Sequence, residues 1–457
     1  MNHLLIHNPA TGELLSELPP DDVHSVAAKA EAARAAQPAW AATPLYERSA
    51  CIARFRALLV AELDSLARTL TDEVGKPIRQ ARNELNGLLP RIDFFLDAVE
   101  ASTAPQTVFD EGGISERIDH DPLGLVANIS AWNYPYFVGA NVFVPALLTG
   151  NAVLYKPSEF ATLTGLRIAD LLHRAGVPAA AFTAVVGAGH VGAALLAQKI
   201  DALFFTGSAA TGAKIAATMG PRLVKLQLEL GGKDPSYVCD DADPKTAAES
   251  LADGAMYNTG QSCCSVERIY VHERIHDAFV AAFLNCVAAM KVGDPLNEET
   301  YIGAITRAAQ IDVLLAQVAD AQARGATLRT GGRRIQRAGN WFEPTVFTEV
   351  NHGMALMREE SFGPIIGIQR VASDDEALRM MNDTRYGLTA GVYSPDRKRA
   401  EALLARVRAG SVYWNCCDRV SPRLPWSGLG DSGIGLTLST QGIQTFTRPR
   451  AWHLRQP

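Results

Sequence analysis

Apolar residues follow two spacings along this chain, one typical of helices and one typical of buried strands. Residues 22–100 carry them at helical spacing, most clearly in the alanine-rich stretches Val23–Ala41 and Ala50–Leu70, so this part is predicted to be helical. Beyond the Pro- and Gly-marked stretch 102–124, short apolar runs alternate with helical ones. The runs with the character of buried strands are Leu125–Ser130, Ala152–Lys156, Ala181–Val186, Ala202–Thr206 and Val224–Leu228.

A second series of the same kind occupies the region between residues 250 and 430. Its strand candidates are Arg268–His272, Phe342–Phe347, Gly363–Arg370, Gly391–Ser394 and Ser411–Trp414. Strands that alternate with helices predict parallel sheets joined by right-handed crossovers. A chain of 457 residues is also too long for one ordinary core. We therefore expect an α/β protein of two or three domains.

Composition narrows the functional classes. Hydrophobic residues make up 47% of the chain and charged residues 20%, and the net charge is −6 with both signs well mixed, so no basic face for nucleic acid is expected. The seven cysteines form no CxxC pair, which argues against a disulfide framework or a metal site and suits a reducing cytoplasm. The first residues lack the pattern of a signal peptide, which also favours a cytoplasmic protein.

One stretch has the length of a membrane span without the right chemistry. Residues 122–155 contain no charged side chain. They do contain three prolines and four asparagines, whose amides a lipid-facing helix would have to bury; the asparagines are Asn128, Asn133, Asn141 and Asn151. We expect a buried strand, loop, helix and second strand of an α/β core, and no membrane partner.

Two turns are candidates for holding phosphate. The sequence 187–192 fits G-x-G-x-x-G after an expected strand, but the acidic partner usually found about 20 residues later is missing. Direct pyrophosphate binding there remains an open alternative. The turn 205–212, which includes Gly207 and Ser208, also joins a strand to a helix, and its hydroxyls and free N–H groups could hold phosphate oxygens.

A thiol and a carboxylate suggest acyl-transfer chemistry. Cys263 lies in the sequence GQSCC, and Glu229 lies in LELGGK. A thiolate can attack a carbonyl, and a carboxylate can then activate the water that releases the acid. Taken alone, a cysteine is more often a small core residue and a glutamate a solvated charge. The motifs around Cys263 and Glu229 favour a catalytic role for both residues.

Together these motifs resemble the aldehyde dehydrogenase superfamily over nearly the whole chain. The resemblance rests on a series of motifs in family order, which are Asn8–Gly12, Trp132–Pro135, Lys156–Glu159, Phe205–Gly212, Leu228–Lys233, Gly260–Cys264, Glu359–Pro364, Asn382 with Tyr386–Leu388, and Pro425–Gly428 with Ser432–Gly433. The family fold implies two doubly wound parallel-sheet domains, one for the cofactor and one for catalysis, plus a small bridging β-sheet. The segments implied are 1–104 and 123–231 for the NAD-binding domain, 232–431 for the catalytic domain, and 105–122 and 445–457 for oligomerisation.

The resemblance assigns catalytic roles at matching positions. Cys263 would attack the aldehyde to give a thiohemiacetal, and a helix starting after the Gly-Gln turn would lower its pKa. The Asn133 side-chain amide and the Cys263 N–H would hold the oxyanion, each such donor being worth about 3 kcal/mol. Hydride then passes to the nicotinamide, and Glu229 would deprotonate the water that hydrolyses the thioester.

Cofactor contacts follow from the same mapping, and NAD is expected rather than NADP. Glu159 would chelate the adenosine ribose and repel a 2′-phosphate, although these positions also suit a surface ion pair after a strand. The phosphates are expected near Ser208. The full set of cofactor residues implied is Trp132, Lys156, Ser158, Glu159, Gly207, Ser208, Glu360 and Phe362, and no metal site is implied.

The substrate mouth and the proton relay are less well defined. Tyr134, Asn141, Cys264 and Trp426 are expected to line the aldehyde tunnel, with residues 418–424 at its entrance. Arg419 or Arg423 could pair with a carboxylate, Asp418 could attract an amine, or these charges could simply be solvated. Many relatives relay the proton through a Lys and a Glu, where this chain has Val142 and Thr437.

The predicted function is therefore NAD-dependent oxidation of a small aldehyde to a carboxylate by a homodimer or homotetramer. A CoA-acylating dehydrogenase is an alternative, although such relatives generally lack the general-base Glu. A catalytically inactive dinucleotide-binding scaffold is the other alternative, and the presence of Cys263, Glu229 and Asn133 counts against it.

Overall fold

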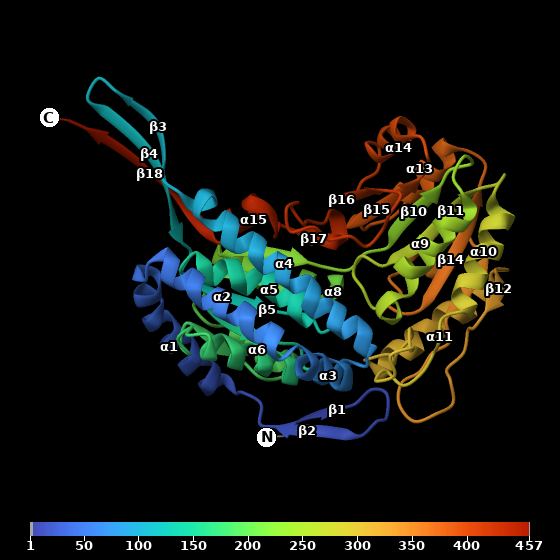
Figure 1. Cartoon of the computed structure of the whole chain (residues 1–457), viewed down its shortest axis with the longest axis horizontal. Coiled ribbons are helices and arrows are strands. Elements are labelled where there is room, and N and C mark those ends of the chain that lie inside the picture. The colour runs from blue at the N-terminus through green and yellow to red at the C-terminus, as the bar shows by residue number, and fades with distance from the viewer. Residues whose placement is uncertain (1–2, 457) are drawn as a thin grey trace.

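Two sheets, each surrounded by helices, organise the chain in the computed structural model, which describes residues 3–456 (Figure 1). Residues 1, 2 and 457, which end two of the expected segments, lie outside the described residues. Both sheets are mainly parallel, and two small antiparallel sheets accompany them. The expected α/β class with two parallel-sheet domains and a separate small sheet is confirmed.

The first sheet has six strands in the order β17-β9-β8-β5-β6-β7. Its strands are β5 (Leu125–Ile129), β6 (Ala152–Lys156), β7 (Phe182–Ala184), β8 (Ala202–Thr206), β9 (Lys225–Glu229) and β17 (Gly433–Ile434). Five of them match expected runs to within a few residues. The sixth, β17, pairs antiparallel with β9 and comes from near the end of the chain, so residues far apart in the sequence close this edge together.

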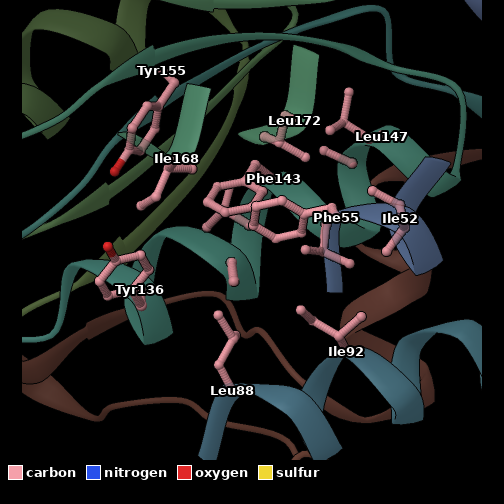
Figure 2. Close-up of a cluster of buried hydrophobic side chains, with 14 of the residues drawn as sticks. Ile52, Phe55, Leu88, Ile92, Tyr136, Phe143, Leu147, Tyr155, Ile168 and Leu172 are labelled. Atoms are coloured by element: carbon pink, nitrogen blue, oxygen red, sulfur yellow. The ribbon is translucent and has the colours of Figure 1, made fainter. Parts of the chain in front are cut away.

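Helices cover both faces of the first sheet. They are α1 (Val23–Ala42), α2 (Leu45–Ala61), α3 (Leu63–Val74), α4 (Ile78–Thr103), α5 (Pro135–Leu148), α6 (Thr162–Arg174), α7 (Gly189–Leu196), α8 (Ala209–Met219), the 3₁₀ turn η1 (Gly220–Arg222) and α15 (Ser439–Gln444). Figure 2 shows side chains of α2, α4, α5 and α6 meeting around Phe143 and Tyr155. The uncharged stretch is thus core, and no helix among residues 3–456 is long and apolar enough to cross a membrane.

The second sheet has seven strands in the order β12-β13-β14-β11-β10-β15-β16. They are β10 (Asp234–Val238), β11 (Val266–His272), β12 (Thr327–Thr330), β13 (Thr345–Thr348), β14 (Ile365–Val371), β15 (Thr389–Tyr393) and β16 (Ser411–Trp414). Its helices are α9 (Pro244–Met256), η2 (Tyr257–Gly260), α10 (His276–Ala288), α11 (Ala308–Ala323), α12 (Ala355–Arg358), α13 (Asp374–Asn382), α14 (Arg397–Leu404) and η3 (Gly430–Ser432).

The central strand β10 was not anticipated from the sequence. It begins with Asp234 and Pro235, residues that argue against an interior strand because proline donates no ladder hydrogen bond. The structure accommodates Pro235 at the start of the strand, where the register with β11 shifts between these two residues. Both residues are therefore tolerated in the middle of the sheet.

The remaining strands form two small antiparallel sheets. β1 (Leu4–His7) pairs with β2 (Leu14–Leu18), and β18 (Thr447–Arg455) pairs with β4 (Ile114–Pro122), which also pairs with β3 (Gln106–Glu111). The three-stranded sheet projects from the body of the molecule beside the C-terminus (Figure 1). It joins the two segments expected to mediate oligomerisation, and its β3 and β18 edges are unpaired within the described part of the chain.

Candidate active site

Glu229 lies where the chain passes from one sheet to the other. β9 ends at this residue and β10 begins at Asp234, so residues 230–233 form the crossing. The Glu229 carbonyl accepts the Gly207 N–H at 3.0 Å, and its backbone pairs with Gly433 of β17. Its side chain thus occupies the carboxyl end of a parallel strand, where open α/β sheets bind their ligands.

Cys263 contacts the same crossing from the second lobe, which consists of the seven-stranded sheet and its helices. It is in the loop between η2 and β11, and its carbonyl oxygen would be 2.7 Å from a Cβ placed on Gly232. The negative charge of Glu229 acts on the Cys263 thiol and raises its pKa. The fold therefore brings these two residues, which are distant in sequence, to one site.

The loop before Cys263 has an unusual backbone. Asn258, Thr259 and Gly260 have φ values of 53°, 59° and 70°, so three successive residues are left-handed. That conformation is costly for asparagine and threonine, and such strain concentrates at functional sites. Gly260 also has no room for a side chain, because a Cβ there would be 2.2 Å from the Gly363 carbonyl oxygen.

The expectation that a helix follows Cys263 is wrong. A short turn follows it, and the chain then enters β11 at Val266. The run from Val266 to His272 is fully buried and pairs with β10 on one side and β14 on the other, so sheet pairing decides its structure. No helix N-terminus therefore lowers the pKa of the thiol.

The Cys263 thiol instead has a pKa above the usual cysteine value. A hydrogen bond with the Cys264 thiol lowers it, but burial and the negative charges of Glu229, Asp234 and Asp418 together raise it more. Cys263 is therefore mainly a thiol at neutral pH in this state. A ligand that brings positive charge beside the sulfur would favour its ionisation.

Asn133 is buried beside the Cys263 loop. Its side-chain amide donates to the Gln261 carbonyl at 3.1 Å. The Asn258 amide donates to the carbonyls of Asn133 and Gln261, at 3.2 and 2.9 Å, and so links the two segments. The expected oxyanion donor is thus hydrogen-bonded to Gln261, which is two positions before Cys263 in the sequence.

Glu229 is buried and held by an indole. Trp426, expected to line the tunnel, donates from Nε1 to Oε1 of Glu229 at 2.5 Å. Burial raises the pKa of Glu229, while the Trp426 hydrogen bond, the charge of Arg91 and a hydrogen bond with Thr206 lower it, and burial prevails. The carboxyl group is thus poised to hold or release a proton at higher pH than a solvated glutamate.

Uncharged residues, Val142 and Thr437, occupy the two positions where many relatives carry the Lys and the Glu of the proton relay. Val142 is a buried apolar residue of α5. Thr437 pairs through its backbone with Trp426, and its buried Oγ1 has no hydrogen-bond partner among residues 3–456. Thr437 therefore fixes the position of the tryptophan that contacts Glu229.

Lys156 fits the expected dinucleotide site. It ends β6 and is buried, and its ammonium donates to the Pro157 carbonyl at 3.2 Å, its one hydrogen bond within the described part of the chain. Burial lowers its pKa, an effect that nearby Glu159 opposes. An ammonium has three donors, so ribose hydroxyls would satisfy this group. Ser158 and Glu159 follow it, with Ser158 buried and Glu159 partly exposed.

Two helix starts carry the candidate phosphate-binding turns. Ser208 caps α8, and its Oγ accepts the Thr211 N–H at 3.4 Å. Gly207, before it, packs against the Phe205 ring, where a Cβ would come within 2.5 Å. The G-x-G-x-x-G turn begins α7. A Cβ placed on its Gly192 would be 3.7 Å from the Lys156 side chain. The α7 turn therefore lies beside Lys156, whereas the α8 turn adjoins Glu229, whose carbonyl accepts the Gly207 N–H.

Glu360 and Phe362 approach the crossing from the second lobe. The Glu360 carboxylate accepts the Gly232 N–H at 3.2 Å, and although the residue is partly exposed, burial of the carboxylate and the charge of Glu267 raise its pKa to about 8. The Phe362 ring packs edge-on against Trp132, with centroids 5.5 Å apart. The expected nicotinamide-side residues thus connect the second sheet with the crossing and with the segment that carries Asn133.

Sequence reasoning missed the support of this segment. Glu267 of β11 accepts the N–H groups of Ser361 and Phe362 at 2.9 and 3.0 Å, and its carboxylate pairs with the buried Lys233 at 2.5 Å. Phe362 has a φ of 47°, so this tether holds it in a left-handed conformation. The lysine was visible in the LELGGK motif, but its partner carried no local signal.

The expected tunnel residues have charged neighbours from α4, from the turn before it and from the expected entrance loop. Tyr134 stacks on Phe137 at 6.0 Å and lies 3.8 Å from Lys76 Nζ, which forms a buried ion pair with Glu84. Glu84 also accepts the N–H groups that begin α5. Cys264 donates to Asp418 at 2.9 Å.

Arg91 was missed as well. Its Nη1 donates to Asn141 Oδ1 at 2.9 Å, so the expected tunnel residue Asn141 is paired with a cation. Glu84 and Arg91 are seven residues apart and share the buried face of α4 with Leu88 and Ile92. Charges at apolar positions of a helix were the signal that could have found them.

Comparison with known proteins agrees with this arrangement. A sequence model of the aldehyde dehydrogenase family matches residues 2–452. The peroxisomal aminoaldehyde dehydrogenase 1 of Pisum sativum is 32% identical over 451 residues, which cover 96% of this chain and 90% of that protein.

Two solved structures of other proteins are similar to the structure of this chain. The NAD-dependent aldehyde dehydrogenase of Sinorhizobium meliloti has a TM-score of 0.96 and 33% identity, with 100% of this chain and 92% of that one covered. An NADP-dependent enzyme of E. coli has a TM-score of 0.97 and 29% identity. The match covers 100% of this chain and 95% of that one.

Proposed function

The chain belongs to the aldehyde dehydrogenase family, and from this premise we propose that it oxidises a small aldehyde to a carboxylate with NAD through a thioester on Cys263. The observation that carries the proposal is the convergence of Cys263, Glu229 and Asn133 at the crossing between the lobes. Aldehyde oxidation follows from the family, whereas the cysteine chemistry and the choice of NAD are inferences from these residues.

The proposed chemistry begins at sulfur. The Cys263 thiolate attacks the carbonyl carbon, a C–S bond forms, and the carbonyl electron pair moves to oxygen, which the Asn133 amide and the Cys263 N–H stabilise. A dinucleotide held by residues such as Lys156, Ser208 and Glu360 would supply the hydride acceptor for oxidation of this adduct to a thioester. Glu229 then takes a proton from water as the water attacks the acyl carbon, and the C–S bond breaks to restore the sulfur.

A direct assay tests the proposal. Purified protein is given a panel of aldehydes with NAD or NADP, with and without CoA, and reduced cofactor is followed by absorbance. Reduction without CoA is expected, because Glu229 can activate water at the acyl-enzyme. Strict dependence on CoA would indicate acyl transfer to a thiol, and no reduction with any aldehyde would indicate a binding scaffold.

Glu159 supports the choice of NAD, and its substitution gives a test. We expect Glu159→Gln to raise the ratio of kcat/KM with NADP to that with NAD by about tenfold, because removing a partly exposed carboxylate relieves repulsion of a 2′-phosphate. Glu100→Gln removes an exposed carboxylate of α4 and serves as the control. An unchanged ratio in Glu159→Gln would place the 2′-position elsewhere.

Trp426 should set the pH dependence of hydrolysis. The indole N–H stabilises the ionised form of Glu229, so Trp426→Phe is expected to raise the pKa of Glu229 further above its usual range. The base is active only when deprotonated, so the acidic limb of the steady-state rate should move to higher pH, while the pH profile of the first turnover stays unchanged.

The control for this change is Trp40→Phe. Trp40 is also buried, and its indole donates to the Leu147 carbonyl at 3.0 Å, so it matches the loss of an indole hydrogen bond outside the site. Identical pH profiles for Trp426→Phe and the unaltered protein would show that the indole does not tune the base.

The three-stranded sheet supports assembly of two or four copies. Unpaired edges of β3 and β18 can pair with another chain, and Val108, Phe109 and Leu454 are exposed on this sheet. Light scattering should give the mass of a dimer or tetramer, and a monomer would refute this part of the proposal. All seven cysteines are free, which suits the reducing cytoplasm that we propose as its location.

A further inference from the structure

We propose that Arg91 of α4 binds a carboxylate on the substrate, so that the preferred substrate is an oxo-acid, an aldehyde that also carries an anionic group. This inference rests on the proposed aldehyde oxidation and specifies its substrate class. It is carried by the position and the incomplete hydrogen bonding of one buried side chain.

Arg91 is buried without a charge partner. The residue is 5% exposed, and no carboxylate oxygen among residues 3–456 lies within 4.0 Å of its nitrogens. Its Nη1 donates to Asn141, its Nη2 makes a long contact of 3.5 Å with the Val420 carbonyl, and its Nε has no hydrogen-bond partner in the described part of the chain. Burial lowers its pKa to about 10, so the group is still charged at neutral pH.

Two arginines elsewhere in this chain, the buried Arg268 and the half-buried Arg48, are held by the protein itself. The guanidinium of Arg268 donates to the carbonyls of Lys233, Met380 and Met381 and to a tyrosine hydroxyl, all at 2.8–3.0 Å. Arg48 likewise donates to three carbonyl oxygens. A structural arginine here saturates its donors, so the free donors of Arg91 require another explanation.

The surroundings of Arg91 are those of the proposed reaction. Its guanidinium lies 4.2 Å from the centre of the Phe137 ring, and Phe137 stacks on Tyr134 next to Asn133. The charges of Glu229 and Glu84, and to a smaller extent the Cys264 thiol, act on it. Asn141 and Val420, its two hydrogen-bond acceptors, belong to the expected tunnel wall and the expected entrance loop. The guanidinium therefore lies among residues expected to line the substrate tunnel, close enough to Glu229 for their charges to interact.

The charge balance of the tunnel favours an anion. Lys76 and Glu84 neutralise one another in a buried ion pair. Asp418 accepts a hydrogen bond from the Cys264 thiol, so its carboxylate is already engaged by the protein. Arg91 interacts with the charges of Glu229 and Glu84 but forms no ion pair within 4.0 Å in the described part of the chain. A carboxylate would satisfy its free donors, whereas the ammonium of an aminoaldehyde would add a second positive charge beside it.

A matched set of substrates tests the proposal. Three aldehydes of similar length are compared: one with a terminal carboxylate, one with a terminal methyl group and one with a terminal amine. In the unaltered protein we expect kcat/KM to be about 100-fold higher for the oxo-acid than for the neutral aldehyde. Arg91→Met should remove most of this preference and change kcat/KM for the neutral aldehyde by less than about threefold.

The use of kcat/KM separates two effects of Arg91. Its charge also lowers the pKa of Glu229, which affects hydrolysis of every acyl-enzyme, but kcat/KM reports only steps up to hydride transfer. Arg91→Lys, which keeps the charge but loses the planar fork, should retain part of the preference. Arg419→Met and Arg423→Met are the controls, because these exposed arginines of the entrance loop are the other cations near the tunnel.

Binding provides a readout that needs no turnover. A short dicarboxylate, the product of an oxo-acid, should bind the unaltered protein in calorimetry and bind Arg91→Met at least about tenfold more weakly. A preference for the aminoaldehyde, equal use of all three aldehydes, or loss of the preference in Arg419→Met or Arg423→Met instead would overturn the assignment. Failure of every aldehyde with intact, Arg91-dependent dicarboxylate binding would refute the proposed oxidation and leave the anion site standing.

Discussion

Replacing Cys263 with Ala is expected to abolish aldehyde oxidation, with kcat falling about 10⁴-fold or more, while NAD still binds. The reason is that every later step needs the bond between this sulfur and the substrate carbon. The side chain is small and half-buried, so its loss should leave the fold and the cofactor residues of the first lobe unchanged. Turnover is followed by absorbance of the reduced cofactor, and NAD binding by calorimetry.

The adjacent thiol provides the control. Cys264 is buried, and its thiol donates to Asp418 at 2.9 Å. Its hydrogen bond with Cys263, followed by burial and the charge of Asp418, raises its pKa well above the usual cysteine value. Cys264→Ala should therefore retain turnover. Activity that survives in Cys263→Ala and disappears in Cys264→Ala would assign the reaction to the other sulfur.

Replacing Glu229 with Gln is expected to separate the two halves of the reaction. The first turnover should remain fast, so a burst of reduced cofactor appears, and the steady-state rate should then fall by about 10²- to 10⁴-fold because no base activates the water. Glutamine keeps the size of the side chain and can still accept the Trp426 hydrogen bond, so the geometry of the pocket is preserved. Stopped-flow absorbance measures both phases.

A chemical rescue makes this test more specific. A strong nucleophile such as hydroxylamine attacks a thioester without help from a base, so it should restore turnover in Glu229→Gln and have little effect on Cys263→Ala. An unaltered steady-state rate in Glu229→Gln would refute the role of this carboxylate. Loss of the burst together with the steady state would instead mean that Glu229 acts before the thioester forms.

Local pattern predicted much of the fold because strands and helices bury apolar faces at their own spacing. The runs at β6 and β8 match the observed strands to the residue. The failures came from residues whose structure depends on distant partners. β10 begins with Asp234 and Pro235 and is a strand because β11 and β15 lie on either side of it. Likewise, the turn after Cys263 leads into a central strand and not into a helix.

The site shows the same division. Cys263, Glu229 and Asn133 lie in short motifs that the sequence displays directly. Trp426 was expected to line the tunnel, and its hydrogen bond to Glu229 is a contact that no local pattern in the sequence indicated. Arg91 had no motif at all. Its place in the tunnel follows from the packing of α4 against α5 and the entrance loop.

The amino-acid sequence by itself determined the α/β class, the family and the chemical groups available for reaction, because periodicity and short motifs are local properties of the chain. Only the tertiary structure decided which of those groups meet. The pKa values of Cys263 and Glu229, the indole on the general base and the unpaired guanidinium of Arg91 all depend on burial and on neighbours far away in sequence. Electrostatic energies grow as water is excluded, and water is excluded only when the two lobes and the loops between them close around the pocket.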